Sequence, residues 1–412
     1  MIDVVGVPAE GLEALPPAHQ QRIAAARTLV GSPRLLDLAP VVDGQLRRSW
    51  PSPMLPSMES FLGEIGVDGV VVLATGDPLV SGVGSTLIRV LGADRVRVHP
   101  AVSSVALARA RMGWPSESTE VVSLVSRSVY AVRRHLAPGA RVVALSASGD
   151  TPVGLARALV ELGLGDTAMS VLGDLGAVEE SRFDCAAAEL ADGRAPGPDG
   201  IPALNVVALE VPATAILWGS SPGLPEEAFA HDGQISKREV RALVIAALRP
   251  MAGQRLWDLG AGSGSVSVEW CLAAPRTTAV AVERDAVRSA RVGKNAETFG
   301  VPISVTTGDS IDVVDQLPSP DAVFIGGGAT ADLIGAAWEA LRPGGRLVVH
   351  CVTLDTEALV VAAQGRLGGD LRRVSIERAE ALGRHLSWTP ARPIVQWSAT
   401  KPHAATRQQG TS

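Results

Sequence analysis

The sequence predicts an α/β protein that contains two domains with mostly parallel sheets. The 412 residues exceed one compact domain and suit two domains of about 200 residues each. Hydrophobic residues make up 46% and charged residues 19% of the chain, which provides for sizeable cores and excludes a disordered chain. Short apolar, strand-like runs alternate with stretches of helical length from end to end, which is typical of α/β layering.

Composition also excludes several classes of function. The formal net charge is −6, and we find no basic stripe of the kind that binds nucleic acid. The three cysteines are far apart without a CxxC pair, which argues against a disulfide framework and a thiolate zinc site. The first residues carry no basic segment, and apolar runs such as residues 70–74 are too short to span a membrane. We therefore expect a cytoplasmic enzyme without a metal, nucleic-acid or membrane partner.

In the first half, five strands and two helices are predicted before a boundary region. The strands are expected at residues 3–6, 69–74, 141–146, 169–172 and 204–211, and the helices at 101–112 and 152–162. A loop is expected over 192–202, and a Gly/Pro/Ser-rich break over 219–225 separates two differently patterned halves. The resulting division is a domain at 1–212, a linker at 213–230, a domain at 231–402 and a polar tail at 403–412.

The second half has a more regular pattern. Ser236 to Glu239 reads Ser-Lys-Arg-Glu, a capping box that predicts a helix running to about residue 249 with Ser236 as its N-cap. Seven strands then predict one mostly parallel sheet, at residues 255–259, 278–283, 303–306, 321–325, 346–352, 371–378 and 393–400.

The most specific motif is a glycine loop directly after the first of these strands. Residues 257–264 read Trp-Asp-Leu-Gly-Ala-Gly-Ser-Gly, so that Asp258 precedes Gly260, Gly262 and Gly264. Glycines at such a turn allow the backbone to approach a ligand that a β-carbon would block. The spacing is GxGxG rather than the GxGxxG of dinucleotide-binding proteins, which disfavours a nicotinamide cofactor.

The carboxyl ends of the next three strands carry residues that also suit a cofactor and substrate site. Glu283 lies 19 residues past Gly264, where a carboxylate can accept ribose hydroxyls. Asp309 and Ser310 follow the third strand and suit an adenine, and Gly326 after the fourth suits the floor of a substrate cleft. The alternative is that the glycines only permit tight turns and that Glu283 is a solvated strand end. Four matching strand ends favour a cofactor site, since open α/β sheets bind ligands at this edge.

This half resembles the class I S-adenosylmethionine-dependent methyltransferases. Residues 232–241, Asp-Gly-Gln-Ile-Ser-Lys-Arg-Glu-Val-Arg, resemble the helix-opening signature of the decarboxylating methyltransferases of cobalamin biosynthesis. The resemblance covers residues 226–400 and implies a Rossmann-like domain in which Ser236 touches the cofactor. A plain N-cap is the alternative for Ser236.

The first half resembles the tetrapyrrole methylases across residues 2–212. The resemblance rests on the segments 4–11, 71–82, 99–104 and 148–153. It implies two α/β subdomains with the cofactor folded between them, in a pocket lined by Thr75, Gly76, Asp77, Pro78, Ser103 and Ser104. The opening loop departs from the family's Gly-x-Gly-Pro, because Pro8 and Ala9 follow Val7, and Pro8 removes a backbone donor.

Together, the two halves resemble the fused methyltransferases of cobalamin biosynthesis. This implies two S-adenosylmethionine molecules, one per domain, and a precorrin substrate, precorrin-6B, that becomes precorrin-8X. The first domain would methylate meso carbon 5, and the second would methylate meso carbon 15 and remove carbon dioxide from the ring-C acetate. Alternatives are a cobalt-containing substrate, or one domain that only binds a ligand. We also expect a homo-oligomer.

Some polar residues outside these motifs are ambiguous. We expect His350 to be a packing residue, whereas His385 could equally line the substrate site. Clustered arginines are expected on solvated faces, although some could pair with substrate carboxylates. They are Arg127, Arg133, Arg134, Arg372, Arg373, Arg378 and Arg384. No catalytic acid is identified from the sequence.

Overall fold

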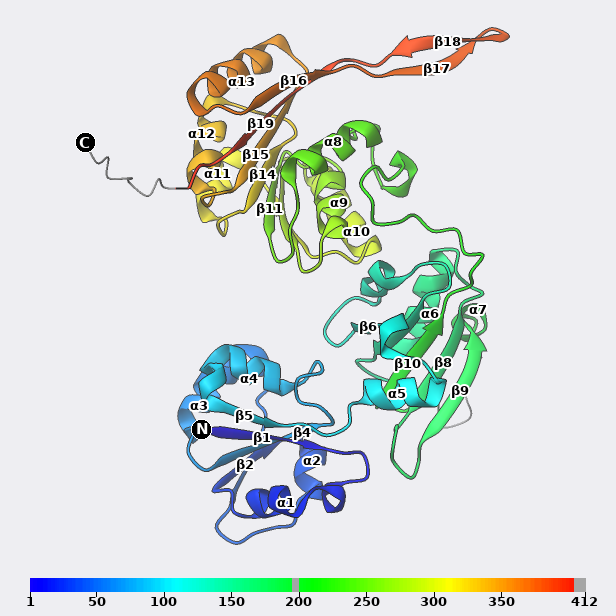
Figure 1. The fold of residues 1–412 in the computed structure, drawn as a ribbon, viewed down its shortest axis with the longest axis vertical. Helices are drawn as coiled ribbons and strands as arrows, with labels where there is room; N and C mark the ends of the chain where they lie inside the picture. The colour runs from blue at the N-terminus through cyan, green and yellow to red at the C-terminus, as the bar shows by residue number, and fades with distance from the viewer. Residues whose placement is uncertain (195–199, 404–412) are drawn as a thin grey trace, which may run out of the picture. The chain divides into compact units, whose positions relative to one another are not determined.

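The computed structural model describes residues 1–194 and 200–403. The chain divides into two compact units, Met1–Leu217 (unit 1) and a second unit that begins at Trp218 (unit 2) (Figure 1). Part of the expected loop at 192–202 and nearly all of the expected tail at 403–412 lie outside the described residues. Within the described residues, no helix is both long enough and apolar enough to span a membrane.

Unit 1 begins with a five-stranded parallel sheet in the order β3-β2-β4-β1-β5. Its strands are β1 (Ile2–Val7), β2 (Thr28–Gly31), β3 (Leu46–Ser49), β4 (Val70–Thr75) and β5 (Val96–His99). Its helices are α1 (Pro17–Ala24), α2 (Pro33–Leu38), α3 (Met54–Ile65) and α4 (Val83–Leu91). Alternate residues of β4 enter two different cores, so residues 70–74 are all apolar, as expected of a parallel strand covered on both faces.

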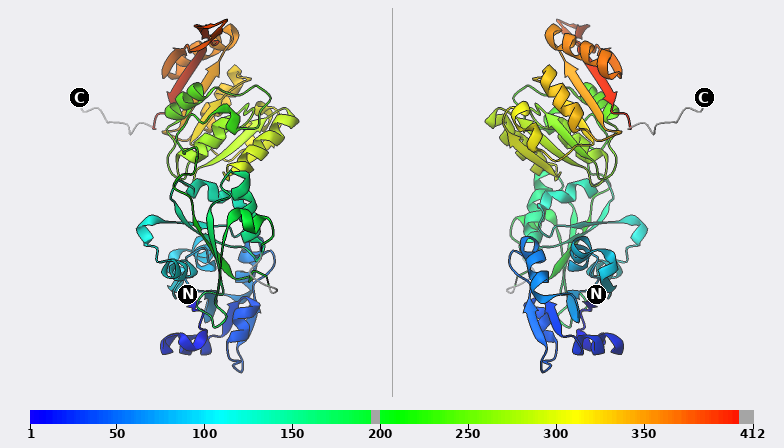
Figure 2. Two further views of the ribbon diagram at one scale, coloured as in Figure 1. Left: turned by 90° about the vertical axis from the view of Figure 1, so that its right-hand side faces the viewer. Right: turned by 90° about the vertical axis from the view of Figure 1, so that its left-hand side faces the viewer.

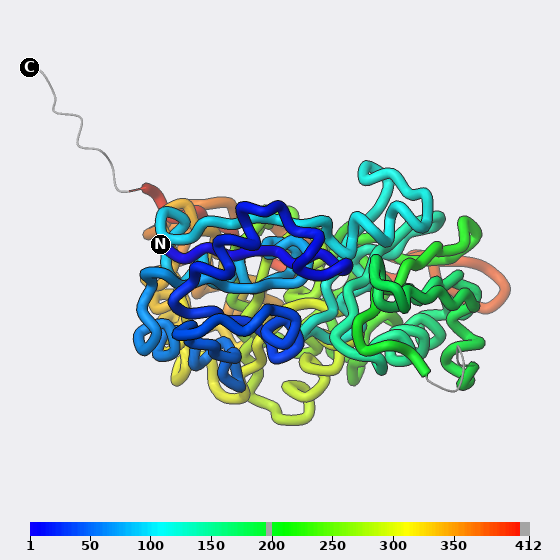
Figure 3. The backbone as a smooth tube through the Cα atoms, turned by 90° about the horizontal axis from the view of Figure 1, so that it is seen from below, coloured from blue at the N-terminus to red at the C-terminus, as the bar shows by residue number. Residues whose placement is uncertain are grey.

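The second sheet of unit 1 is mixed, in the order β6-β7-β10-β8-β9. Its strands are β6 (Thr119–Ser123), β7 (Arg141–Leu145), β8 (Ala168–Gly173), β9 (Ser181–Ala186) and β10 (Asn205–Glu210). Its helices are α5 (Ser104–Met112), α6 (Thr151–Glu161) and α7 (Ala187–Ala191). In the tube of Figure 3, the blue to cyan part of unit 1 and its cyan to green part form separate groups of segments. Each part contains one of the two sheets, which agrees with the two expected subdomains.

Unit 2 contains one seven-stranded sheet in the order β13-β12-β11-β14-β15-β19-β16. Five neighbouring strands are parallel and β19 is antiparallel, so the expected seven-stranded, mostly parallel sheet is confirmed. The strands are β11 (Arg255–Leu259), β12 (Thr278–Glu283), β13 (Ile303–Thr307), β14 (Ala322–Ile325), β15 (Arg346–Cys351), β16 (Asp370–Val374) and β19 (Ile394–Thr400).

Helices cover both faces of this sheet (Figure 2). Residues of α8 (Arg238–Leu248), α9 (Ser265–Ala273) and α10 (Ala286–Thr298) pack with Leu256, Phe324 and Val348 on one face. Residues of α12 (Ala331–Ala340) and α13 (Leu354–Leu367) pack with Trp257, Val349 and Trp397 on the other. The remaining short helices of the described residues are α11 (Ser310–Val313) and six 3-10 helices at Leu12–Ala14, Ala93–Arg95, Ser116–Ser118, Val129–His135, Glu226–Ala228 and Val314–Gln316.

Two sequence-based expectations for unit 2 are wrong. Helix α8 begins at Arg238 with Lys237 in the N-cap position, so Ser236 is not its N-cap. Glu226 Oε1 accepts the Arg238 N–H at 3.0 Å, and Glu239 pairs with Arg238 and Arg378 instead of closing a capping box. The strand expected at 371–378 is two strands, because the chain leaves the sheet after β16. It then forms a hairpin of β17 (Glu377–Leu382) and β18 (His385–Pro390), which projects from the body of unit 2 (Figure 1).

Candidate functional site

The glycine loop of unit 2 connects β11 to α9 at the carboxyl edge of the parallel strands. A β-carbon at Gly260 would lie 2.7 Å from the Gly327 carbonyl oxygen, and one at Gly264 would lie 2.6 Å from Val292 Cγ1. A β-carbon at Gly262 would meet nothing nearer than the Gln234 carbonyl oxygen, at 3.9 Å. The first and third glycines are therefore required by packing within the protein, whereas Gly262 has room for a β-carbon, which would lie at an ordinary contact distance from the Gln234 carbonyl.

Glu283 at the end of β12 fixes the shape of this loop. The side chain is buried, and its Oε2 accepts the Gly262 N–H at 2.8 Å while Oε1 accepts the Asp285 N–H at 3.0 Å. The alternative that Glu283 is a solvated strand end is therefore wrong. Each oxygen retains a second lone pair, so a ribose hydroxyl can still be accepted.

Asp258 is a buried acid of the site with a raised pKa. Its carboxyl is 1% exposed; Oδ2 accepts hydrogen bonds from the Ser267 N–H at 3.2 Å and the Ser267 hydroxyl at 2.7 Å. Burial raises the pKa of Asp258 to about 6, with nearby Glu283 adding to the rise and the Ser267 hydrogen bonds opposing it. Oδ1 is buried and has no hydrogen-bond partner among the described residues. A donor or cationic group on a ligand would satisfy this atom.

The other expected residues of unit 2 lie along the same edge. The Gly308 N–H donates to the Glu283 carbonyl at 3.1 Å, which places Asp309 and Ser310 beside Glu283. The Gly326 N–H donates to the Leu259 carbonyl at 3.1 Å, so the loop after β14 adjoins the glycine loop. Ser236 is half-buried just before α8. Among the described residues, no His, Cys, Asp or Glu side chains form a cluster of three or more that could hold a metal.

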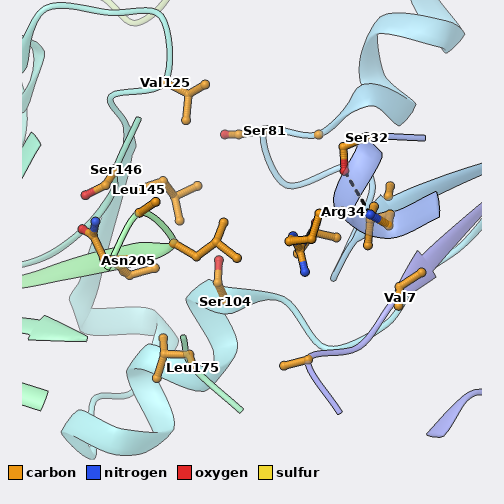
Figure 4. A pocket seen from close by; sticks show the side chains of 18 of the residues that line it. Val7, Ser32, Arg34, Ser81, Ser104, Val125, Leu145, Ser146, Leu175 and Asn205 are labelled. Atoms are coloured by element: carbon orange, nitrogen blue, oxygen red, sulfur yellow. Dashed lines mark hydrogen bonds between the residues drawn. The ribbon is translucent and has the colours of Figure 1, made fainter. Parts of the chain in front are cut away.

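Unit 1 contains a cavity of about 780 Å³ that both subdomains line (Figure 4). Thr75 and Ser104 line it, as do Pro8 and Ala9 of the unusual opening loop. The other four expected residues shape the neighbouring loops and are not among its lining residues. Three of them accept hydrogen bonds from backbone N–H groups: the Asp77 carboxylate from Leu79, the Ser103 hydroxyl from Ala106 and the Pro78 carbonyl from Gly84. The fourth, Gly76, donates its own N–H to the Val7 carbonyl.

The polar residues of this cavity that were not expected from the sequence include Ser146, Asn205 and Arg34. Ser146 and Asn205 lie close together on one wall, and Arg34 lies on the opposite wall (Figure 4). Ser146 Oγ and Asn205 Oδ1 are buried without a partner among the described residues, and Arg34 donates to Thr75 Oγ1 at 3.0 Å. These residues lie in three distant segments without a common motif, so no sequence signal joins them.

The two histidines for which the sequence left packing and substrate binding open, His350 and His385, lie in different environments. His350 is buried, its Nε2 is 2.9 Å from Gln396 Oε1, and its ring meets Phe324 edge-on, as expected of a packing residue. Burial lowers the pKa of His350, which favours the neutral ring. His385 is exposed in the projecting hairpin. Three of the ambiguous arginines, Arg372, Arg373 and Arg378, form ion pairs with Asp370, Glu357 and Glu239.

Two family models match the chain in succession. Residues 1–191 match the tetrapyrrole (corrin/porphyrin) methylases, and residues 227–401 match the precorrin methyltransferase domain. The two matches fall in unit 1 and unit 2, respectively.

Curated relatives match along nearly the whole chain. The chain is 44% identical over 404 residues to a precorrin-6Y C(5,15)-methyltransferase (decarboxylating) of Mycobacterium tuberculosis strain CDC 1551, covering 97% of this chain and 100% of the relative. It is 42% identical to the enzyme of the same name from Sinorhizobium sp, covering 97% of this chain and 96% of the relative. The crystal structure of the C-terminal domain of a precorrin-6Y C5,15-methyltransferase from Rhodobacter capsulatus is 46% identical, with a TM-score of 0.43, and covers 45% of this chain and 100% of that chain. The chain belongs to the family of the decarboxylating precorrin-6Y C(5,15)-methyltransferases.

Proposed function

We propose that this enzyme methylates precorrin-6B at meso carbons 5 and 15 and decarboxylates the ring-C acetate, to give precorrin-8X. The observation that carries the proposal is the near-full-length similarity to relatives of that named activity. Those names contain no cobalt, which disfavours the cobalt-containing substrate. We assign methylation at carbon 5 to unit 1, and methylation at carbon 15 with decarboxylation to unit 2, each with its own S-adenosylmethionine.

The residues of unit 2 fit S-adenosylmethionine. When bound, the cofactor supplies a methyl group already activated by its sulfonium. Gly262 leaves room for it, the unpaired Asp258 Oδ1 suits its ammonium group, and the Glu283 carboxylate suits its ribose hydroxyls. Because these groups are fixed by internal hydrogen bonds before binding, the protein's contribution is to hold methyl donor and macrocycle carbon in line in a site with little water.

Unit 1 is proposed to hold the second cofactor in the 780 Å³ cavity. The unpaired oxygens of Ser146 and Asn205 would accept hydrogen bonds from donor groups of the cofactor. Arg34 on the opposite wall would pair with a carboxylate of the tetrapyrrole, since a guanidinium forms paired hydrogen bonds to such a group. Cofactor and substrate would thus occupy chemically different walls of one cavity.

We further propose that the chain forms a homo-oligomer through the β17–β18 hairpin. Cross-strand pairs Ala379–Trp388 and Ala381–Leu386 lie on one face of this hairpin, and Leu386 and Trp388 are 75% and 68% exposed. An isolated two-stranded hairpin is marginally stable in water, so this apolar face is expected to be covered by another copy.

The division of labour predicts that Gly262→Arg abolishes decarboxylation. The added side chain would fill the open side of the glycine loop, so unit 2 could not bind its cofactor. Purified full-length chain is incubated with precorrin-6B and methyl-labelled S-adenosylmethionine, and the products are analysed by mass spectrometry. Wild type should add two methyl groups and lose carbon dioxide.

The control Gly365→Arg, on the exposed face of α13, should behave as wild type. Carbon dioxide release by Gly262→Arg would refute the assignment to unit 2.

The raised pKa of Asp258 predicts a pH-dependent affinity. The unfolded pKa is 3.8 and the folded pKa about 6, so the ligand-free unit is stabilised by the neutral form below pH 4 and loses that stabilisation as pH rises through 6. The ammonium group of a bound ligand such as S-adenosylhomocysteine favours the ionised form of Asp258. Affinity for S-adenosylhomocysteine at one site should therefore rise about tenfold between pH 5 and 7.5, measured by calorimetry. Asp258→Asn should remove this rise, whereas Asp321→Asn, at the opposite edge of the sheet, should retain it. An unchanged rise in Asp258→Asn would contradict the proposed role.

The hairpin proposal predicts that Trp388→Glu dissociates the oligomer. A buried carboxylate in the apolar contact would be costly, whereas Ser387→Glu places the same charge on the opposite face of the hairpin. Sedimentation velocity should show a smaller species for Trp388→Glu and the wild-type species for Ser387→Glu. Equal masses for the two variants would overturn the assignment of this face.

A further inference from the structure

A buried ion pair joins two helices of unit 2 beneath the segment that precedes α8. Arg241 of α8 and Glu269 of α9 are 0% and 1% exposed, and Arg241 Nε lies 2.6 Å from Glu269 Oε1. Helix α9 begins at the glycine loop, so Glu269 is rigidly connected to the proposed cofactor site. Arg241 belongs to the segment 232–241 that the sequence analysis singled out, but it has no role in the proposed chemistry.

The remaining hydrogen bonds of the pair hold both ends of residues 223–236, which we call the strap. Glu269 accepts the Gly223 N–H at 3.0 Å and the Leu224 N–H at 2.9 Å. Arg241 donates to the Leu224 carbonyl and, at 2.6 Å, to the Ser236 carbonyl. The guanidinium also lies 4.7 Å from the centre of the Phe229 ring, between the two ends. One ion pair therefore determines where the strap starts and where it ends.

The middle of the strap is attached to the glycine loop. Asn295 of α10 accepts the Ala230 N–H at 2.8 Å, and its Nδ2 donates to the carbonyls of Ala230 at 3.0 Å and Ser263 at 2.8 Å. Beyond this point Asp232 pairs with Arg288 and Arg291 at the start of α10. The Gln234 carbonyl is then the nearest atom to the open side of Gly262. The strap thus lies against the glycine loop.

We propose that Arg241 and Glu269 are positioning residues that hold the strap at a fixed distance from the glycine loop and thereby set the cofactor affinity of unit 2. The inference rests on the proposed function, since it assumes that the cofactor binds at the glycine loop beside the strap. A buried ion pair stabilises a fold little better than apolar residues of the same volume. The remaining hydrogen bonds of the Arg241–Glu269 pair are made to the strap. The specific effect of the pair is therefore to fix the positions of Ser236 and Gln234 relative to the glycine loop.

The test compares Arg241→Lys with Arg346→Lys in the full-length chain. Arg346 is also buried and donates to the Leu248 and Arg249 carbonyls at the other end of α8, away from the glycine loop. Lysine retains the charge but cannot reach several carbonyls at once. S-adenosylhomocysteine is titrated, and protection from hydrogen exchange is followed in peptides that contain residues 258–264 and, separately, in peptides of unit 1.

Arg241→Lys should raise the half-saturating concentration for residues 258–264 at least tenfold and leave unit 1 unchanged. Arg346→Lys should lower thermal stability without this shift. Equal half-saturation in wild type and Arg241→Lys would overturn the proposed positioning role. If Arg241→Lys does not fold, Glu269→Gln is measured by the same criterion. Absence of protection at 258–264 in wild type would instead refute the cofactor site itself.

Discussion

Buried carboxylates that accept backbone N–H groups determine the geometry of unit 2. Glu283 binds the N–H groups of Gly262 and Asp285, and Glu269 binds those of Gly223 and Leu224. These segments have no strand or helix of their own to fix them. A buried carboxylate, in turn, must be hydrogen-bonded to be tolerated. Acid and loop therefore stabilise each other, and the loops are already in place before a ligand arrives.

Asp258 departs from this pattern, and the departure indicates function. It receives hydrogen bonds on one oxygen only, and burial raises its pKa to about 6. A fold could remove this cost with an apolar residue. A cationic ligand that bound beside Asp258 would complete the environment of this acid. In unit 1, Ser146 Oγ and Asn205 Oδ1 are likewise buried without a partner among the described residues, but they are neutral groups.

The sequence placed the expected residues of unit 2 at one edge of the sheet because they follow consecutive strands, and their role in binding a cofactor stays a prediction. Strand periodicity and the glycine spacing locate Asp258, Gly262 and Glu283 without tertiary information. The sequence did not show that Gly260 and Gly264 are required by packing, since Gly327 and Val292 approach only in the folded chain.

Other features depended on partners far away in sequence. The capping box at Ser236 is wrong because Glu226, ten residues earlier, accepts the first helical N–H, and Glu239 pairs with Arg378. The strand expected at 371–378 ran across the break between β16 and β17, and the rest of the hairpin was not predicted. In unit 1, Arg34, Ser146 and Asn205 converge from separate elements, so the loops were predicted but not the polar groups of the cavity.

The central claim is that each unit holds its own cofactor, and a calorimetric count of binding sites tests it most directly. Titration of the full-length chain with S-adenosylhomocysteine should give two sites per chain, and Gly262→Arg should leave one. A single site in wild type, or two sites in Gly262→Arg, would contradict the account.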